Sequence, residues 1–219
     1  MIVLAPARLV RALTAAASTL EASADELNLL DGYAGDGDLG ITMSEASRAL
    51  KEVLAANEGM GAAQLLTACG ATIARRAPST SGTLVASGFL RAAKEVADIA
   101  GSDVGVLERA FAAATAGIQA RGKATVGDRT LVDGLDAVCT SLRESLGAGR
   151  ELGDALHFAA LAASATADKT VDMEPKVGRA SWVPQRAAGH PDAGCAMLAI
   201  VLRAAAAEIT AGGPAPASG

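Results

Sequence analysis

Residues 30–40 of the chain read LDGYAGDGDLG, which places four glycines and three aspartates within eleven residues. Glycine adopts backbone conformations that are closed to other residues, and aspartate often bonds to nearby backbone N–H groups in turns. Neither residue type favours the interior of a helix or a strand. The stretch therefore predicts a tight loop, around which the rest of the chain is arranged.

The carboxylates of Asp31, Asp36 and Asp38 give this loop its chemistry. Like charges held close together repel one another unless a cation neutralises them, and carboxylate oxygens suit Mg²⁺ and Ca²⁺. Aspartates that cap helices or point to solvent from a turn are the simpler alternative. Because the glycines would let the backbone fold the carboxylates inward, the pattern favours a metal site, with Mg²⁺ held together with phosphate groups.

Familiar glycine-rich motifs do not account for these residues. An EF-hand counted from Asp36 lacks its bidentate glutamate, because Ser47 stands at the twelfth position. The Gly-x-Gly-x-x-Gly spacing of residues 35–40 fits a dinucleotide fingerprint, but a helical pattern precedes it where a strand is required. Residues 117–124, GIQARGKA, lack the final Ser or Thr of a P-loop.

Apolar residues recur at helical spacing on both sides of the loop, as Leu9, Leu13 and Leu20 do on its amino-terminal side. Only 2% of the residues are aromatic, which also favours helix over strand. Eight helices with short links predict an all-α antiparallel bundle or closed barrel with its binding loops at one end. The expected helices span residues 5–26, 42–57, 62–76, 83–99, 104–121, 129–146, 151–172 and 193–210.

A chain of 219 residues, 51% of them hydrophobic, is long enough for one well-buried core. We expect a single domain over residues 1–211 and a flexible Gly/Pro/Ser-rich tail over 212–219. The formal charge of −5 and the lack of a basic stripe in the sequence argue against nucleic acid as a partner.

The sequence gives little indication of a membrane-spanning segment, a signal peptide or disulfide bonds. The apolar run of residues 195–209 is interrupted by Arg203 and Glu208 and is too short to span a bilayer. Residues 1–10 do not have the pattern of a signal peptide. Three widely spaced cysteines suit reduced thiols better than a disulfide framework, so we expect a cytoplasmic protein that does not bind membranes.

Three further polar segments begin or connect the expected helices. Residues 79–82, STSG, offer hydroxyls and free N–H groups as anion sites at helix starts do, although ordinary capping explains them equally well. Residues 127–130, GDRT, open another helix in the same style. Residues 174–191 form the longest stretch without helical pattern, which is more often functional than idle. Within it, His190 fits either a cap-stabilising hydrogen bond or a ligand contact.

Four sequence blocks follow one another in a recognisable order. They are LDGYAGDGDLGITM at 30–43, STSGTL at 79–84, GKATVGDRTLVDGLDA at 122–137, and GRASW followed by GHPDAG within 178–194. In this order they resemble the nucleotide-binding (L) subunit or domain of dihydroxyacetone kinases, over most of the chain. Only the D-x4-D-x-D loop is specific by itself, whereas the ordered set is a strong signal.

The resemblance implies an eight-helix antiparallel barrel whose loops at one end bind ATP or ADP through two Mg²⁺ ions. Asp31, Asp36 and Asp38 match the aspartates that bind metal in that family. The residues implied to contact the nucleotide are Leu39, Gly40, Ile41, Thr42, Thr80, Ser81, Gly122, Thr130, Leu131, Arg179, Asp192, Ala193 and Gly194.

The implied function is that of a kinase subunit that supplies the phosphoryl donor to a short-chain ketose on a separate K subunit or domain. No base or nucleophile is expected on this chain, because the acceptor hydroxyl would be activated on the partner. Relatives served by a phosphocarrier protein usually have His where this chain has Leu39. ATP and a phosphocarrier both remain as phosphoryl sources, and a homodimer is a further expectation. Two alternatives stay open: a kinase subunit for another small sugar or a fatty acid, and a regulatory module of the same fold.

Overall fold

The computed structural model describes residues 5–57, 59–97 and 101–212. All regular structure in these residues is helical, which confirms the all-α class. The helices are α1 (Pro6–Ala22), α2 (Ala24–Ala34), α3 (Leu39–Ala55), α4 (Ala62–Arg76), α5 (Thr80–Val96), α6 (Asp103–Gly122), α7 (Leu131–Gly147), α8 (Leu152–Thr170), α9 (Pro184–Ala187) and α10 (Ala193–Ala211), with a 3₁₀ helix, η1, at Arg179–Trp182.

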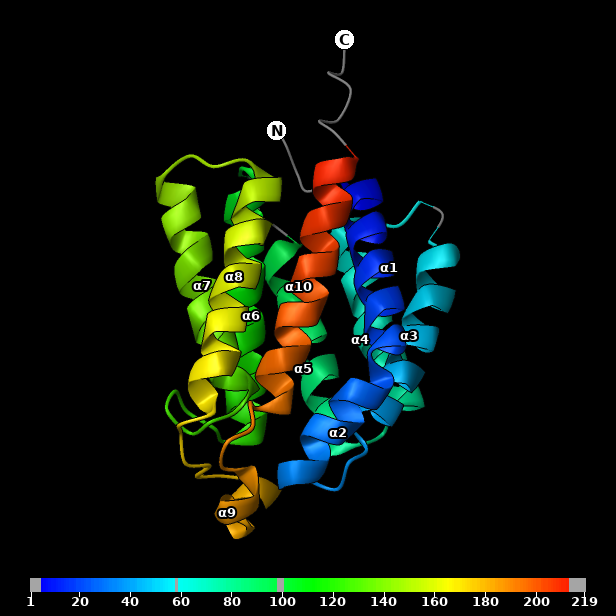
Figure 1. Ribbon diagram of the computed structural model, residues 1–219. Helices are drawn as coiled ribbons and strands as arrows, with labels where there is room; N and C mark the ends of the chain where they lie inside the picture. The colour runs from blue at the N-terminus through cyan, green and yellow to red at the C-terminus, as the bar shows by residue number, and fades with distance from the viewer. Residues whose placement is uncertain (1–4, 58, 98–100, 213–219) are drawn as a thin grey trace.

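Eight long helices close into a ring (Figure 1). Each packs against its neighbours in the order α1, α3, α4, α5, α6, α7, α8 and α10, and α10 returns to α1. Neighbours in the ring run in opposite directions, as short links between helices require. Of the two expected arrangements, an antiparallel bundle or a closed barrel, the closed barrel is the observed architecture.

Because neighbouring helices run in opposite directions, every second connection between the helices of the ring lies at the same end of the barrel. Helix α2 with residues 35–38, and the links at 77–79, 123–130 and 171–192, all lie at the lower end in Figure 1. Helices α2 and α9 pack against each other there, while α1 begins and α10 ends at the opposite end. The four sequence blocks thus come together although they are far apart along the chain: Gly32 and Arg186, which are in contact, are 154 positions apart.

The predicted loop at residues 30–40 begins too early, because Leu30–Ala34 form the last turn of α2. Leu27 is fully buried and Leu30 packs against the same apolar cluster, so burial of one face holds the helix together. That gain outweighs the cost of about 1 kcal/mol for a glycine such as Gly32 in a helix. The expected helix over 5–26 is also divided, because α1 ends at Ala22 and α2 starts at Ala24.

Other boundaries differ by a few residues, while the range 62–76 coincides with α4. Helix α5 starts at Thr80 and not at residue 83, because the Ser79 hydroxyl accepts the N–H of Gly82 at 3.0 Å and so caps the first turn. The segment 174–191 contains η1 and the one-turn helix α9. The expected helix end at 99 and the tail at 213–219 lie outside the described residues.

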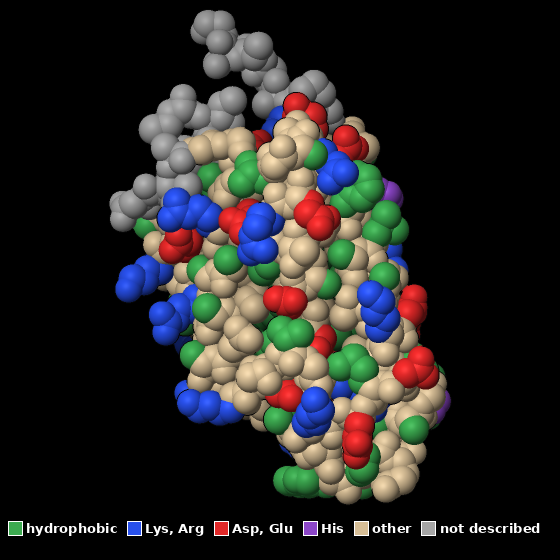
Figure 2. All heavy atoms as spheres, turned by 90° about the vertical axis from the view of Figure 1, so that its left-hand side faces the viewer, with side chains coloured by type: hydrophobic (Ala, Val, Ile, Leu, Met, Phe, Trp, Pro, Cys, Tyr) green, Lys and Arg blue, Asp and Glu red, His purple; other side chains and the backbone are tan. Residues whose placement is uncertain are grey.

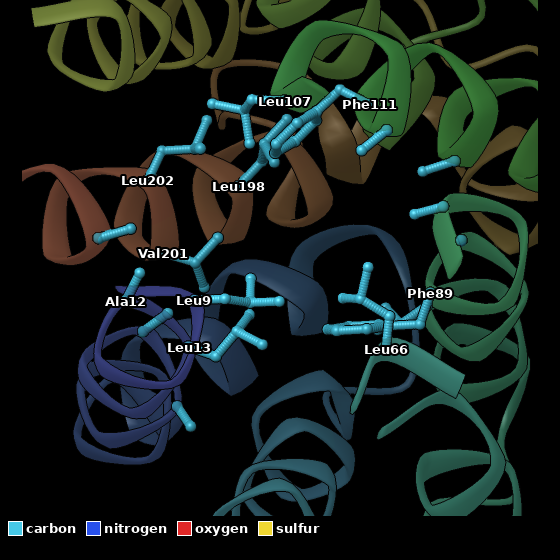
Figure 3. Close-up of a pocket in the computed structure, with 18 of the residues that line it drawn as sticks. Leu9, Ala12, Leu13, Leu66, Phe89, Leu107, Phe111, Leu198, Val201 and Leu202 are labelled. Atoms are coloured by element: carbon cyan, nitrogen blue, oxygen red, sulfur yellow. The ribbon is translucent and has the colours of Figure 1, made fainter. Parts of the chain in front are cut away.

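The interior of the barrel is apolar and is not completely filled (Figure 3). A cavity of about 310 Å³ lies between α1, α5, α6 and α10, and its walls include Leu13, Phe89, Phe111, Leu198 and Leu202. Charged groups are costly to bury where nothing pairs with them. Among the described residues that line this cavity the charged one is Arg8, which already pairs with Asp103 at 2.8 Å. The cavity is therefore poorly suited to a phosphorylated ligand, and we look for polar chemistry in the loops at the end of the barrel.

Helix α10 is the one described helix whose length and composition would suit a membrane span. In the barrel, however, Cys195, Leu198 and Leu202 on this helix are buried against the other helices. A central core helix satisfies the same criteria as a membrane span.

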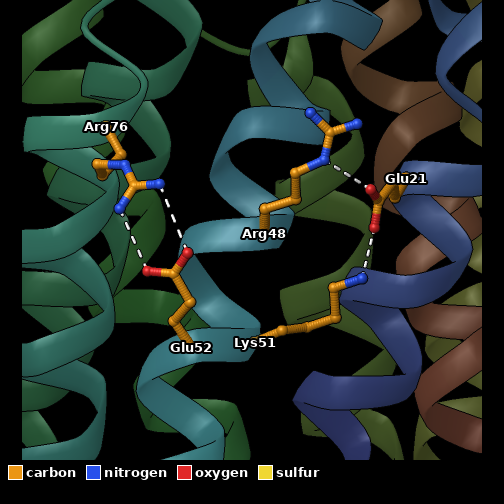
Figure 4. Close-up of polar contacts among 5 residues, drawn as sticks. All are labelled: Glu21, Arg48, Lys51, Glu52 and Arg76. Carbon is orange, nitrogen blue, oxygen red and sulfur yellow. Dashed lines mark hydrogen bonds and ion pairs between the residues drawn. The ribbon is translucent and has the colours of Figure 1, made fainter.

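Ion pairs on the outer surface connect adjacent helices of the ring (Figure 4). Glu21 on α1 accepts a hydrogen bond from Arg48 on α3 at 2.8 Å and also pairs with Lys51, and these two cations lower the pKa of Glu21. Arg76 on α4 pairs with Glu52 on α3 at 3.2 Å. Figure 2 shows acidic and basic side chains interspersed over another face. Exposed ion pairs of this kind contribute little to stability, so burial of apolar side chains in the interior is the main source of the stability of the fold.

Gly40 allows α3 to approach α2 closely, which gives a test of this packing. An added Cβ on Gly40 would overlap the backbone carbonyl of Ala24, whereas a Cβ on Gly147 would meet no heavy atom within 4 Å. We expect Gly40→Ala to lower the free energy of unfolding by about 3 kcal/mol. Gly147→Ala should leave it unchanged or raise it by up to about 1 kcal/mol. Urea denaturation followed by circular dichroism measures both, and equal stability of the two variants would contradict this account.

Candidate functional site

Asp31 organises the loop that joins α2 to α3. Its carboxylate oxygen Oδ2 accepts the backbone N–H groups of Gly37 at 2.8 Å and of Asp38 at 3.2 Å. Gly37 has a φ of +74°, a conformation that side chains rarely adopt, and so turns the chain back toward α2. A Cβ on Gly35 would come within 2.6 Å of the Asp31 carboxylate. The glycines thus allow the loop to wrap around one of its own carboxylates.

The wrapped loop brings the three carboxylates together. Asp31, Asp36 and Asp38 each offer an oxygen, and these oxygens lie within 4.8 Å of one another. Oxygens bound to a single Mg²⁺ ion at about 2.1 Å are roughly 3–4 Å apart, so a small adjustment would place the three on one ion or around two. All three side chains are at least partly open to solvent. The set of hard oxygen ligands fits Mg²⁺, and the sequence prediction of a carboxylate cluster agrees with this geometry.

Residues 171–192 fold over the end of α2 and the loop that follows it, and they contact these two segments at three points. Arg179 in η1 forms an ion pair with Asp36. The Nη2 atom of Arg186 donates to the carbonyl oxygen of Gly32 at 2.7 Å. The rings of Tyr33 and His190 stack with centroids 3.4 Å apart and an interplanar angle of 3°. His190 thus contacts an aromatic ring, a role that neither of its predicted alternatives described.

Two long helices begin beside this loop and direct their first turns toward the same space. Thr80 and Ser81 stand in the first turn of α5, and Thr130 is the N-cap of α7, where its hydroxyl accepts the N–H of Val132 at 3.2 Å. Asp133 completes the cap of α7 by accepting the N–H of Thr130 at 2.8 Å. Free N–H groups at helix starts attract anions, so these ends suit a phosphate group.

Asp192 is the N-cap of α10 and links that helix to the preceding segment. Its Oδ1 atom accepts the N–H of Cys195 at 2.8 Å, and its own N–H donates to the hydroxyl of Thr170 at 2.8 Å. Burial raises the pKa of Asp192 to about 6, while the bond from Cys195 and the charge of Arg129 act in the opposite direction. The carboxyl therefore titrates closer to neutrality than that of an ordinary aspartate.

These elements enclose one cleft of about 380 Å³, within the size range of small-molecule sites. Of the residues predicted from the sequence, those that line it are Asp31, Asp36, Asp38, Thr80, Ser81, Thr130, Arg179, Asp192 and Ala193.

The remaining predicted residues lie behind or beside the cleft wall. Leu39, Gly40 and Thr42 are buried in the first turn of α3, where Ile41 is exposed. Gly122 ends α6, and Leu131 and Gly194 pack against each other at the starts of α7 and α10.

Sequence reasoning did not identify Tyr33 or Arg129 as site residues, although both line the cleft. Tyr33 lies within the glycine-rich stretch and Arg129 within the GDRT block. Their position inside two of the ordered blocks was the sequence feature that could have identified them as site residues. Trp182, which is 80% exposed, also borders the cleft.

Comparison with known proteins places this geometry in a family. Residues 33–207 match the DAK2 domain. The chain is 34% identical to D-erythrulose kinase of Mycolicibacterium smegmatis over 94% of its own length and 36% of that protein. It is 36% identical to triokinase/FMN cyclase of Homo sapiens over 85% of its length and 32% of that protein.

A subunit-sized relative is matched over nearly its whole length. The ADP-binding subunit DhaL of PEP-dependent dihydroxyacetone kinase 1 from Listeria innocua is 31% identical, with 81% of this chain and 84% of that protein covered. The chain thus spans about a third of the two longer kinases and most of this subunit.

Solved structures agree with the fold. The dihydroxyacetone kinase of C. freundii in its native form superposes with a TM-score of 0.73 at 28% identity, covering 91% of this chain and 34% of that one. The same kinase in complex with AMP-PNP and Mg²⁺ gives a TM-score of 0.70 at 28% identity. The residues matched by the DAK2 domain include Asp36 and Asp38, the starts of α5, α7 and α10, and the segment that carries Arg179. Together with the relatives and structures above, this match shows that the chain belongs to the dihydroxyacetone kinase family as a DhaL-like DAK2 domain.

Proposed function

We propose that this chain binds ATP or ADP together with Mg²⁺ and provides the phosphoryl donor of a short-chain ketose kinase. The observation that carries the proposal is that three carboxylates and the starts of α5, α7 and α10 share one cleft. Acidic groups on one part of the wall and anion-attracting helix starts on another suit a metal–phosphate ligand. A relative named as an ADP-binding subunit and a structural neighbour that contains AMP-PNP and Mg²⁺ support it.

Asp31, Asp36 and Asp38 would hold the metal, and we propose two ions as in the family. Held by these carboxylates, Mg²⁺ would supply positive charge to offset the negative charge that develops as a phosphoryl group is transferred. Asp31 can serve the loop and a metal at once, because a carboxylate has about four lone-pair positions and two backbone N–H groups occupy part of this capacity.

The other residues of the cleft would orient the phosphate tail. Thr80 and Ser81 stand at the positive end of the α5 dipole, and Arg179 lies within reach of the acidic loop. Phosphoryl transfer depends mainly on positioning and electrostatic stabilisation, so the protein needs little covalent chemistry of its own. The chain can therefore act as a donor module while the acceptor hydroxyl is activated elsewhere.

The acceptor would be held by a K-type subunit, or by the part of a longer protein that this chain does not span. The longer relatives carry about two thirds of their length outside the matched region. Relatives named for erythrulose, triose and dihydroxybutanone substrates favour a short-chain carbohydrate as the acceptor class. ATP, or a resident ADP that a phosphocarrier protein recharges, would serve as the phosphoryl source.

The metal ligands provide the first test. Asp36→Asn and Asp38→Asn should each weaken binding of Mg²⁺-ADP at least tenfold, about 1.4 kcal/mol, because each removes a charged oxygen ligand. Asp154→Asn on the exposed surface of α8 is the matched control and should bind like the wild type. Isothermal titration calorimetry measures the affinities. No binding by the wild type at millimolar Mg²⁺-ADP, or undiminished binding by both variants, would refute the proposed function.

The Arg179–Asp36 ion pair provides a second test, because a guanidinium there competes with a metal for the same carboxylate. Arg179→Met should strengthen binding of the divalent ion alone and weaken binding of Mg²⁺-ADP several-fold. Mn²⁺, followed by electron paramagnetic resonance, reports the first affinity, and calorimetry reports the second. Arg143→Met, at the far end of α7, should change neither. An equal loss in both affinities would show that Arg179 only maintains the loop.

The acceptor is tested by reconstitution with the native partner. After copurification, the pair should phosphorylate dihydroxyacetone or erythrulose, and the Asp38→Asn form of this chain should abolish turnover. A pair that binds nucleotide but phosphorylates only another small sugar or a fatty acid would support the alternative acceptors. Nucleotide binding with no turnover on any of these substrates would favour the alternative that the chain is a regulatory module of the same fold.

A further inference from the structure

Arg129 lines the cleft with a buried side chain, and only part of its guanidinium group is hydrogen-bonded. The residue is 4% exposed, although arginine is seldom fully buried without a partner. Its Nη2 atom donates to the carbonyl oxygens of Ala187 at 2.5 Å and His190 at 2.6 Å. Among the described residues it forms no ion pair with a carboxylate. Its two hydrogen bonds thus go to neutral carbonyl groups, while the Asp192 carboxylate is near enough for the charge of Arg129 to oppose the rise that burial causes in its pKa.

Two nitrogens of the same guanidinium lack any partner. The Nε and Nη1 atoms are buried, and no acceptor in the described part of the chain reaches them. Buried donors without partners are rare in folded proteins and destabilise them, most of all when they carry charge. The two bonds made by Nη2 explain why the side chain lies in the wall, but they do not explain the unused donors.

The backbone of Arg129 is also in an unfavourable conformation. Its φ of +59° lies in the left-handed region, which Arg seldom adopts. Strained residues that persist in a fold are found disproportionately at functional sites. The strain and the unused donors occur at one residue, which lines the cleft beside Thr130 and Asp192. A ligand that uses the free donors would account for both.

We propose that Arg129 is a second phosphate-binding arginine of the cleft, whose free Nε and Nη1 donors contact an oxygen of the nucleotide's phosphate tail. This rests on the proposed function, because it assumes that a phosphorylated ligand enters the cleft. Phosphate is the ligand chemistry that matches the site, since guanidinium N–H groups bind phosphate oxygens strongly. Arg129 differs from Arg179 in that its side chain is already buried and, within the described part of the chain, forms no direct ion pair, whereas Arg179 pairs with Asp36.

A purely structural role is the rival explanation, since Arg129 also fastens the segment that carries Arg179 and Trp182. Arg129→Gln and Arg129→Lys separate the two roles. Gln is neutral but can still donate to a backbone carbonyl, whereas Lys keeps the charge. Trp182 is the only tryptophan in the chain, so its fluorescence reports the position of this segment independently of binding.

The experiment measures Mg²⁺-ADP affinity by calorimetry and Trp182 emission without ligand, for the wild type and three variants. We expect Arg129→Gln to weaken binding at least tenfold, Arg129→Lys to stay within threefold of the wild type, and both to keep the wild-type emission. Arg143→Gln, near the other end of α7, is the control and should match the wild type in both measurements.

The outcomes distinguish this inference from the proposed function. Unchanged affinity in Arg129→Gln, with a wild type that binds, would overturn the inference alone. Equal losses in the Gln and Lys variants that follow a change in Trp182 emission would assign Arg129 a structural role and overturn it as well. A wild type that does not bind Mg²⁺-ADP would overturn the proposed function and remove the basis of the inference.

Discussion

The proximity of three carboxylates on one short loop is the constraint on which the rest of the site depends. Mutual repulsion would open such a loop, and the structure opposes it in two ways. Asp31 accepts two backbone N–H groups from the loop itself, and Asp36 is neutralised by Arg179. The first contact is internal and fixes the shape of the loop. The second comes from a segment almost 150 residues away and couples the acidic loop to the far side of the cleft.

The closed ring of helices supplies the electrostatic counterpart to this negative charge. Because neighbouring helices alternate in direction, α3, α5, α7 and α10 all begin at the end of the barrel that carries the aspartates. Each helix start carries a partial positive charge. The topology alone therefore places several positive dipole ends around one acidic loop, and this arrangement stabilises both a carboxylate cluster and the phosphate groups that a metal would bring to it.

The sequence was sufficient for the helical class, for an antiparallel bundle or barrel, and for the acidic loop, because these follow from local patterns and short links. Apolar spacing predicted α4 without error, and the paired Gly and Asp residues predicted a turn that draws carboxylates together. The sequence was not sufficient for features that depend on contacts between residues far apart in the chain. The last turn of α2 exists because Leu27 and Leu30 are buried by other helices, so the glycines of 30–40 misplace the start of the loop. His190 likewise finds its partner, Tyr33, across the fold and not in its own helix cap.

Arg129 and Arg179 illustrate the same limit, because nothing in the composition of their blocks tells a buried guanidinium from an exposed one. Arg179 is 54% exposed by side chain and is paired with an acid, so it can exchange partners at little desolvation cost. Arg129 is already buried and its hydrogen-bond partners are carbonyl groups, so an approaching anion need not displace a directly paired carboxylate from it. The cost of removing the Arg129 charge from water is thus met in the fold before a ligand arrives, whereas the exposed Arg179–Asp36 pair couples the entry of a metal to that of a ligand. The cleft thus contains one buried cation, Arg129, and one exposed cation, Arg179. The exposed cation is the one that contacts a proposed metal ligand, Asp36.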